Sequence, residues 1–181
     1  MMPRKICISV IGSGSNDGTL SPQIAKIANE VGKEIAERGA VLICGGLGGV
    51  MAEAAKGAKE RGGLTVGIIP GEDPDSANPY IDISLPTGLG FARNVLVAYS
   101  GDVVIAVNGR LGTLSEISYA LMKKKPVIGI HTWNLDQLSG RICPDEKVYG
   151  DGIIKCESAK EAVDKAFTII ENKTTFQNGS N

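Results

Sequence analysis

The sequence has few of the side chains on which metal, nucleophile and nucleic-acid chemistry depends. It has one histidine, His131, so a histidine-rich zinc site is excluded and a Ser-His-Asp mechanism would rest on this residue alone. Aromatic residues make up 4% of the 181 residues, and the formal net charge at pH 7 is −1. Both values argue against nucleic acid as a partner. We expect no metal site, and we expect His131 to pack, or to border a ligand, at the rim of a sheet.

Long hydrophobic runs are also missing. No segment approaches the ~20 apolar residues that span a bilayer, and residues 6–11 are too short for the core of a signal peptide. The cysteines are Cys7, Cys44, Cys143 and Cys156, and no two have C-x-x-C spacing. Reduced thiols are the simplest interpretation, so we expect a cytoplasmic protein with no membrane partner.

What the chain does have is a regular alternation of strand-like and helical segments. The expected strands are residues 5–11, 40–44, 64–69, 102–107 and 127–130, with weaker ones at 81–84 and 152–155. The expected helices are residues 22–38, 50–61, 91–100, 114–124 and 158–171. The strands are continuously apolar, which is typical of parallel strands covered on both faces. The sequence predicts an α/β fold of the Rossmann-like, doubly wound type, with a mostly parallel sheet and helices on both faces.

The length fits one domain, and no repeat or linker interrupts it. We expect residues 1–172 to form this domain and the polar residues 173–181 to form a flexible tail.

Three of the strands end in glycine-rich turns that lead into helices. The first turn contains Gly12, Ser13, Gly14 and Ser15; the second contains Gly45, Gly46, Gly48 and Gly49; the third contains Gly109, Arg110, Gly112 and Thr113. In a parallel sheet all three lie at the carboxyl edge, where open α/β sheets bind ligands. Glycine lets the backbone approach a phosphate, and the next helix offers free N–H groups. Glycines also shorten turns in any α/β fold, but three such junctions favour one shared pocket for a phosphate or another anion.

The glycines do not form the best-known nucleotide motifs. After Gly12 and Gly14, Asp17 stands where a dinucleotide fingerprint has its third glycine. No G-x-x-x-x-G-K-[ST] run is present, so ATP hydrolysis of the P-loop kind is not supported.

Two charged residues near these turns have both a structural and a functional interpretation. Glu116 follows Thr113 by three residues, which is the spacing of a capping box. The same position would also allow the Glu116 carboxylate to act in a functional site. Arg93, followed by Asn94, lies in an otherwise apolar stretch, where it would clamp a phosphate, pair with a nearby acid or be a solvated charge.

Three motifs, in this order and spacing, resemble the LOG-like superfamily. They are G-G-L-G-G-V-M at residues 45–51, G-F-A-R-N at 90–94 and G-x-x-G-T-L-S-E at 109–116. The superfamily includes nucleotide phosphoribohydrolases that activate cytokinins, proteins labelled lysine decarboxylases, and molybdenum-cofactor carrier proteins. The resemblance spans about residues 5–130, and the length and the Arg93-Asn94 pair are most similar to the carrier branch.

The resemblance implies roles for Arg93 and Glu116, which match the residues that act on the N-glycosidic bond in the hydrolase branch. That branch carries P-G-G-x-G-T-x-x-E and R-K, whereas this chain has Asn108, Arg110 and Asn94 at three of those positions. No lysine here has a context that marks it as a pyridoxal-binding residue, so decarboxylation is not supported.

These residues and the resemblance support two alternative functions. The first is a binding or carrier protein for a phosphate-bearing small molecule, either a nucleotide, a pterin like the molybdenum cofactor, or an oxyanion such as molybdate. The alternative is a nucleoside 5′-monophosphate phosphoribohydrolase, in which Glu116 stabilises oxocarbenium character and orients water while Arg93 holds the substrate. The helices at 91–100 and 114–124 carry many apolar residues, so we also expect a homodimer.

Overall fold

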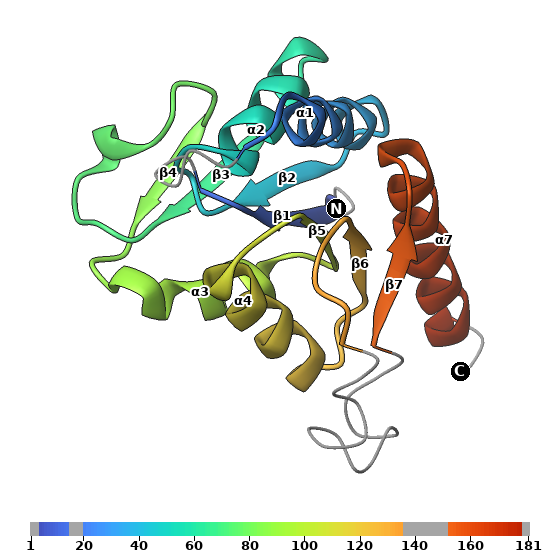
Figure 1. Ribbon diagram of the computed structural model, residues 1–181. Helices are drawn as coiled ribbons and strands as arrows, with labels where there is room; N and C mark the ends of the chain where they lie inside the picture. Colours follow the sequence, from blue (N-terminus) through green and yellow to red (C-terminus); the bar gives the residue numbers. More distant parts are fainter. Residues whose placement is uncertain (1–3, 15–19, 136–151, 179–181) are drawn as a thin grey trace.

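The computed structural model describes residues 4–14, 20–135 and 152–178 of the chain (Figure 1). Its strands are β1 (Cys7–Gly12), β2 (Val41–Cys44), β3 (Thr65–Ile69), β4 (Ile83–Pro86), β5 (Val103–Val107), β6 (Val127–Ile130) and β7 (Ile153–Cys156). They form one parallel sheet in the order β4-β3-β2-β1-β5-β6-β7. Both the strong and the weak strand predictions are confirmed.

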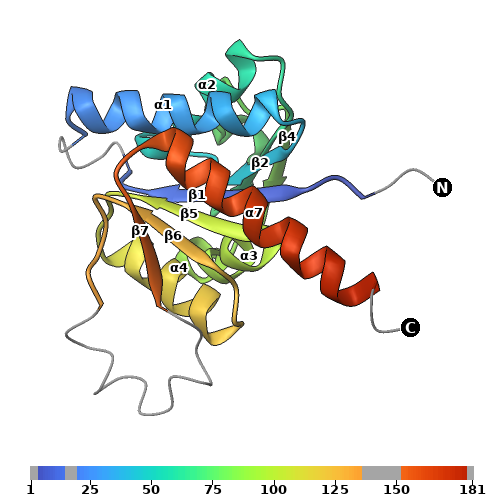
Figure 2. The ribbon, with the colours of Figure 1, turned by 90° about the vertical axis from the view of Figure 1, so that its right-hand side faces the viewer.

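Helices cover both faces of this sheet. They are α1 (Pro22–Glu37), α2 (Val50–Glu60), α3 (Asn94–Ser100), α4 (Leu111–Met122) and α7 (Ala159–Asn178), with short 3-10 turns η2 (Pro74–Ser76) and η3 (Gly90–Arg93). One face is covered by α1, α2 and α7, and the other by α3 and α4 (Figures 1 and 2). All five residues of β5 are buried between these layers. The predicted Rossmann-like α/β fold is confirmed. Within the described residues, no helix is both long and apolar enough to cross a membrane.

The start of α1 shows how local sequence sets a boundary. Ser21 Oγ accepts a hydrogen bond from Ile24 N at 3.2 Å, and Pro22 occupies the first helical position. Gly39, with φ of 71°, follows the helix end. These are the capping signals from which the helix was predicted.

Three helix boundaries differ from the prediction. The segment 91–100 is divided into η3 and α3, and α4 begins at Leu111 rather than at residue 114. The earlier start of α4 follows from the turn before it, where Asn108 and Gly109 have φ of 53° and 126° and direct the chain into the helix. In α7 the helix continues to Asn178, into the segment predicted as a tail, because no glycine or proline interrupts residues 173–178.

The strand order places the three glycine turns together. β1 pairs with β2 on one side and with β5 on the other, so the chain builds the sheet outward in both directions from β1. The turns that follow β1, β2 and β5 therefore meet at the carboxyl edge, at the point where the strand order reverses. Open α/β sheets bind ligands at this position.

Candidate functional site

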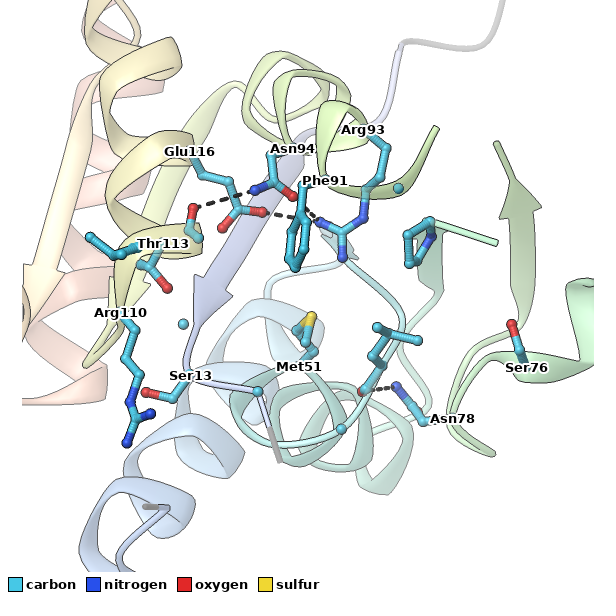
Figure 3. Close-up of a pocket in the computed structure, with 18 residues that line it drawn as sticks. Ser13, Met51, Ser76, Asn78, Phe91, Arg93, Asn94, Arg110, Thr113 and Glu116 are labelled. Atoms are coloured by element: carbon cyan, nitrogen blue, oxygen red, sulfur yellow. Dashed lines mark hydrogen bonds and ion pairs between the residues drawn. The ribbon is translucent and has the colours of Figure 1, made fainter. Parts of the chain in front are cut away.

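A cavity of about 820 Å³ opens at this edge of the sheet (Figure 3). The predicted site residues that line it are Gly12, Ser13, Gly14, Gly48, Arg93, Asn94, Arg110, Gly112, Thr113 and Glu116. Gly45, Gly46, Gly49 and Gly109 are not among the lining residues and lie in the turns behind it. Ser15 lies outside the described residues. The three glycine junctions thus converge on one cavity, while the contact of each residue with a ligand stays a prediction.

The first and second junctions are joined through their backbones. Val50 N, the first residue of α2, donates a hydrogen bond to Ser13 O at 2.9 Å. Gly49 has φ of 71°, and a Cβ atom there would lie 2.2 Å from Ser13 O. Only glycine permits both this backbone conformation and this close approach.

The third junction is held by a segment that follows β6. Thr132 Oγ1 donates to Asn108 O at 2.6 Å, and Trp133 Nε1 donates to Arg110 O at 3.3 Å. These two bonds fix the turn from which α4 starts. Sequence reasoning missed both residues, because nothing local marks a bond across more than twenty positions.

His131 precedes these two residues but takes no part in the cavity. It is exposed, has φ of 48°, and does not line the cavity. The predicted packing role is therefore wrong, because the turn after β6 directs His131 outward while Thr132 and Trp133 contact the third junction.

Arg93 and Glu116 form a buried ion pair in the wall of the cavity. Arg93 Nη1 lies 3.3 Å from Glu116 Oε1, and the two side chains are 8% and 9% exposed. The same Nη1 donates to Asn94 Oδ1 at 2.7 Å, and Nη2 donates to Gly45 O at 3.3 Å. Arg93 Nε is buried without a hydrogen-bond partner in the described part of the chain. The guanidinium is thus held between α4 and the second junction.

Asn94 connects this pair to the third junction. Its Nδ2 donates to Ser115 Oγ at 2.9 Å and to Gly112 O at 3.4 Å, while Ser115 Oγ donates to Gly112 O at 2.7 Å. A continuous chain of hydrogen bonds therefore runs from the start of α4 to Arg93.

The alternative structural role for Glu116 is excluded by the position of α4. Because the helix begins at Leu111, its N-cap is Arg110, and no side chain caps it. Thr113 lies inside the first turn, where a capping box with Glu116 cannot form. The Glu116 carboxylate instead points toward Arg93 in the cavity wall (Figure 3).

Burial shifts the pKa values of the groups around this pair. It raises the pKa of Glu116 to about 7, an effect that the nearby Arg93 charge opposes. Burial also lowers the pKa of Arg93, against the attraction of Glu116, and raises the pKa of the Cys44 thiol to about 11. Near neutral pH, Glu116 therefore exchanges a proton while Arg93 keeps its charge.

This raised pKa predicts how stability depends on pH. The folded protein holds the Glu116 proton more tightly than the unfolded chain does. Protonated Glu116 therefore contributes fully to the free energy of unfolding below pH 4.5, and this contribution is lost as the pH rises through about 7. We expect the free energy of unfolding of the wild type to fall by about 3 kcal/mol relative to Glu116→Gln between pH 4.5 and 8. Urea unfolding of both proteins across this range measures the difference. Parallel pH profiles would contradict a raised pKa.

Four apolar residues also line the cavity, and sequence reasoning did not single them out. They are Leu47, Met51, Pro70 and Phe91, and Phe91 is 87% exposed. Two polar lining residues at the end away from Arg110 already have internal partners (Figure 3). Asn78 Nδ2 donates to Gly46 O at 3.1 Å and Leu47 O at 2.9 Å, and Ser76 Oγ donates to Asp73 O. Leu47, Met51 and Phe91 fall within the quoted motifs, whereas residues 70–78 carry no comparable signal.

The end of the cavity between the first and third junctions is polar. Ser13 and Thr113 line it, and each residue is 3% exposed. Both lie at the same end as Arg110, away from Ser76 and Asn78 (Figure 3). The helices α2 and α4 begin here, both without a side-chain cap.

Solved structures of similar proteins share this architecture. The molybdenum cofactor binding protein from the phototrophic bacterium Rippkaea orientalis is 38% identical, with a TM-score of 0.80, covering 92% of this chain and 98% of that one. The Moco carrier protein from Chlamydomonas reinhardtii is 35% identical, with a TM-score of 0.80, covering 93% and 99%.

Sequence comparisons agree with this placement. The cytokinin riboside 5′-monophosphate phosphoribohydrolase of Mycobacterium tuberculosis is 31% identical over 121 residues, which cover 61% of this chain and 64% of that protein. The model of the SLOG cluster4 family matches residues 5–163. The chain therefore belongs to the SLOG cluster4 family, within the LOG-like superfamily and close to its molybdenum-cofactor carrier proteins.

Proposed function

We propose that this protein binds and carries a phosphate-bearing small molecule, such as a nucleotide or a pterin like the molybdenum cofactor, or else an oxyanion such as molybdate. The similarity to molybdenum cofactor binding and carrier proteins over nine-tenths of the chain supports a ligand-binding carrier role. The choice among these ligands belongs to the proposal.

The observation that carries this proposal is the position of Ser13 and Thr113, two hydroxyl-bearing residues that line the same end of the cavity (Figure 3). Here both hydroxyls lie beside the starts of α2 and α4, whose free N–H groups and dipoles favour negative charge. An oxyanion at this end would satisfy the hydroxyls and both helix ends together.

The apolar lining supports the remainder of the ligand. Met51 and Phe91 offer a polarisable sulfur and an exposed aromatic ring, which favour contact with a flat ring system. The cavity therefore suits a molecule that joins an anionic group to a planar ring.

Removing the two hydroxyls tests this assignment. We expect Ser13→Ala and Thr113→Val each to weaken binding of a phosphate-bearing ligand about tenfold, because each deletes one hydrogen bond to a charged oxygen. Stability should change little, since each change removes only a hydroxyl from a residue that lines the cavity. Calorimetric titration with AMP and with molybdate measures the affinities, and Ser118→Ala, on the exposed side of α4, is the matched control. Unchanged affinity in both variants, beside normal wild-type binding, would contradict the proposal.

The second candidate is a nucleoside 5′-monophosphate phosphoribohydrolase. One observation favours it: Glu116 lines the cavity and has a pKa near 7, which suits a group that stabilises charge and moves a proton. Two contacts oppose this candidate. Arg93 Nη1 donates a hydrogen bond to the Glu116 carboxylate, and the same Nη1 donates to Asn94 Oδ1. We therefore place binding first.

We also propose that the protein forms a homodimer through its α3–α4 face. Large apolar side chains are exposed along this face: Phe91, Leu96, Tyr99, Leu111 and Met122. Exposed apolar patches of this kind mark association surfaces. Light scattering at micromolar concentration should give twice the mass of one chain, and Met122→Lys with Leu96→Glu should shift it to the monomer. A monomeric wild type would contradict this proposal.

A further inference from the structure

Asn78 lies at the end of the cavity away from Ser13 and binds the second junction through both its backbone and its side chain (Figure 3). Its backbone N donates to Gly46 O at 2.8 Å. Its Nδ2 donates to Gly46 O at 3.1 Å and to Leu47 O at 2.9 Å. Asn78 belongs to none of the three glycine turns, because it lies between β3 and β4. The second junction is therefore held by a segment that is distant from it in the sequence.

The side-chain amide of Asn78 is itself fixed in one orientation. Its Oδ1 accepts a hydrogen bond from Tyr80 N at 3.1 Å, so its NH2 group faces the junction. Tyr80 O in turn accepts from Thr65 Oγ1 at 2.6 Å, which anchors this segment to β3. The donor that reaches the junction is thus positioned from outside the cavity.

The bonds from Asn78 set the direction of two amide groups in the junction. Among the described residues no peptide bond is cis, and in a trans peptide the N–H group points opposite to the carbonyl. Asn78 holds the carbonyls of Gly46 and Leu47 on its own side, so the N–H groups that follow these carbonyls point away from Asn78. These N–H groups belong to Leu47 and Gly48, and both residues line the cavity.

We propose that Asn78 is a positioning residue for ligand binding, which holds the second junction in the conformation in which the N–H groups of Leu47 and Gly48 donate to the anionic group of the ligand. This inference rests on the proposed binding function and adds the residue that prepares the junction for its ligand. Backbone N–H groups in a turn before a helix bind phosphates and other oxyanions. Without the Asn78 side chain the junction adopts other conformations, and the apparent affinity falls in proportion to the fraction that remains competent.

Removing this side chain tests the inference. We expect Asn78→Ala to weaken binding of AMP and of molybdate about tenfold, which corresponds to a junction that keeps its binding conformation in about one-tenth of the molecules. Thr65→Val is the matched control, because it releases the same segment from β3 but leaves both bonds from Asn78 Nδ2 in place. It should lower the free energy of unfolding and leave both affinities unchanged. Calorimetric titration of the folded variants measures the affinities.

Amide resonances supply a measurement that a general loss of stability does not change. In amide proton–nitrogen correlation spectra of the wild type, the signals of Leu47 and Gly48 should shift as molybdate is added, because both N–H groups gain a new acceptor. In ligand-free Asn78→Ala these two signals should differ from those of the wild type, whereas in Thr65→Val they should coincide with them. The wild-type titration tests the inference even if Asn78→Ala does not fold.

The outcomes distinguish this inference from the proposed function. Signals of Leu47 and Gly48 that stay fixed while the wild type binds molybdate would overturn the inference and leave the binding function in place. Unchanged affinity in Asn78→Ala, or an equal loss in Thr65→Val, would do the same. A wild type that binds neither molybdate nor AMP would overturn the binding function and the inference with it. A loss of affinity confined to Asn78→Ala, with shifts of both amide signals in the wild type, would support both.

Discussion

Replacing Arg93 by alanine should weaken ligand binding between tenfold and a hundredfold and lower the free energy of unfolding by about 3 kcal/mol at pH 8. The affinity falls because Arg93 lines the cavity and carries a positive charge. The stability falls because Glu116 stays buried without its partner and Asn94 and Gly45 lose hydrogen bonds.

A double variant separates these two effects. Arg93→Ala with Glu116→Gln removes the unpaired carboxylate, so it should recover much of the lost stability but not the lost affinity. Arg61→Ala, which breaks an exposed pair with Glu37, should change stability by less than about 1 kcal/mol. If Arg93→Ala unfolds at the same urea concentration as the wild type, the buried pair of Arg93 and Glu116 does not stabilise the fold.

Replacing Gly49 by alanine should lower the free energy of unfolding by about 3 kcal/mol and abolish measurable ligand binding. With φ of 71° and ψ of −137°, Gly49 has a conformation that is essentially limited to glycine and costs an alanine about 1 to 3 kcal/mol. The added Cβ would also lie 2.2 Å from Ser13 O, so the first and second junctions must separate. That separation breaks the bond from Val50 N and displaces Ser13 from the cavity.

The chain contains a control for the positive φ alone. Gly39 has the same φ of 71°, but a Cβ there would meet nothing within 4 Å. Gly39→Ala should therefore cost only the backbone strain, about 1 kcal/mol, and leave binding unchanged. Equal costs in the two variants, measured by urea unfolding, would show that the close approach to Ser13 contributes nothing.

The fold and the junctions were predictable because their signals are local. Continuous apolar strands, separated by helices of regular period, specify a parallel sheet, and the topology then brings every strand-ending turn to one edge. The three glycine turns could thus be assigned to one cavity before their contacts were known. The start of α4 was misplaced because Thr113 and Glu116 imitate a capping box, while the turn at Asn108 and Gly109 starts the helix earlier.

The remainder of the site depends on contacts between distant segments. The pairing of Arg93 with Glu116 joins η3 to α4, and no spacing within either segment indicates it. The bonds from Thr132 and Trp133 to the third junction likewise arise only after β6 has paired with β5. The apolar lining was missed because Leu47, Met51 and Phe91 resemble ordinary core residues, although they fall within the motifs at residues 45–51 and 90–94.

Mass spectrometry of the small molecule that remains bound to the purified protein tests the central claim most directly. A carrier that binds without turnover should retain a phosphate-bearing molecule intact, and Ser13→Ala with Thr113→Val should lose it. The same measurement on protein incubated with AMP should find the nucleotide unchanged. Free adenine released by the wild type, and absent with Glu116→Gln, would contradict the account and identify the protein as a phosphoribohydrolase.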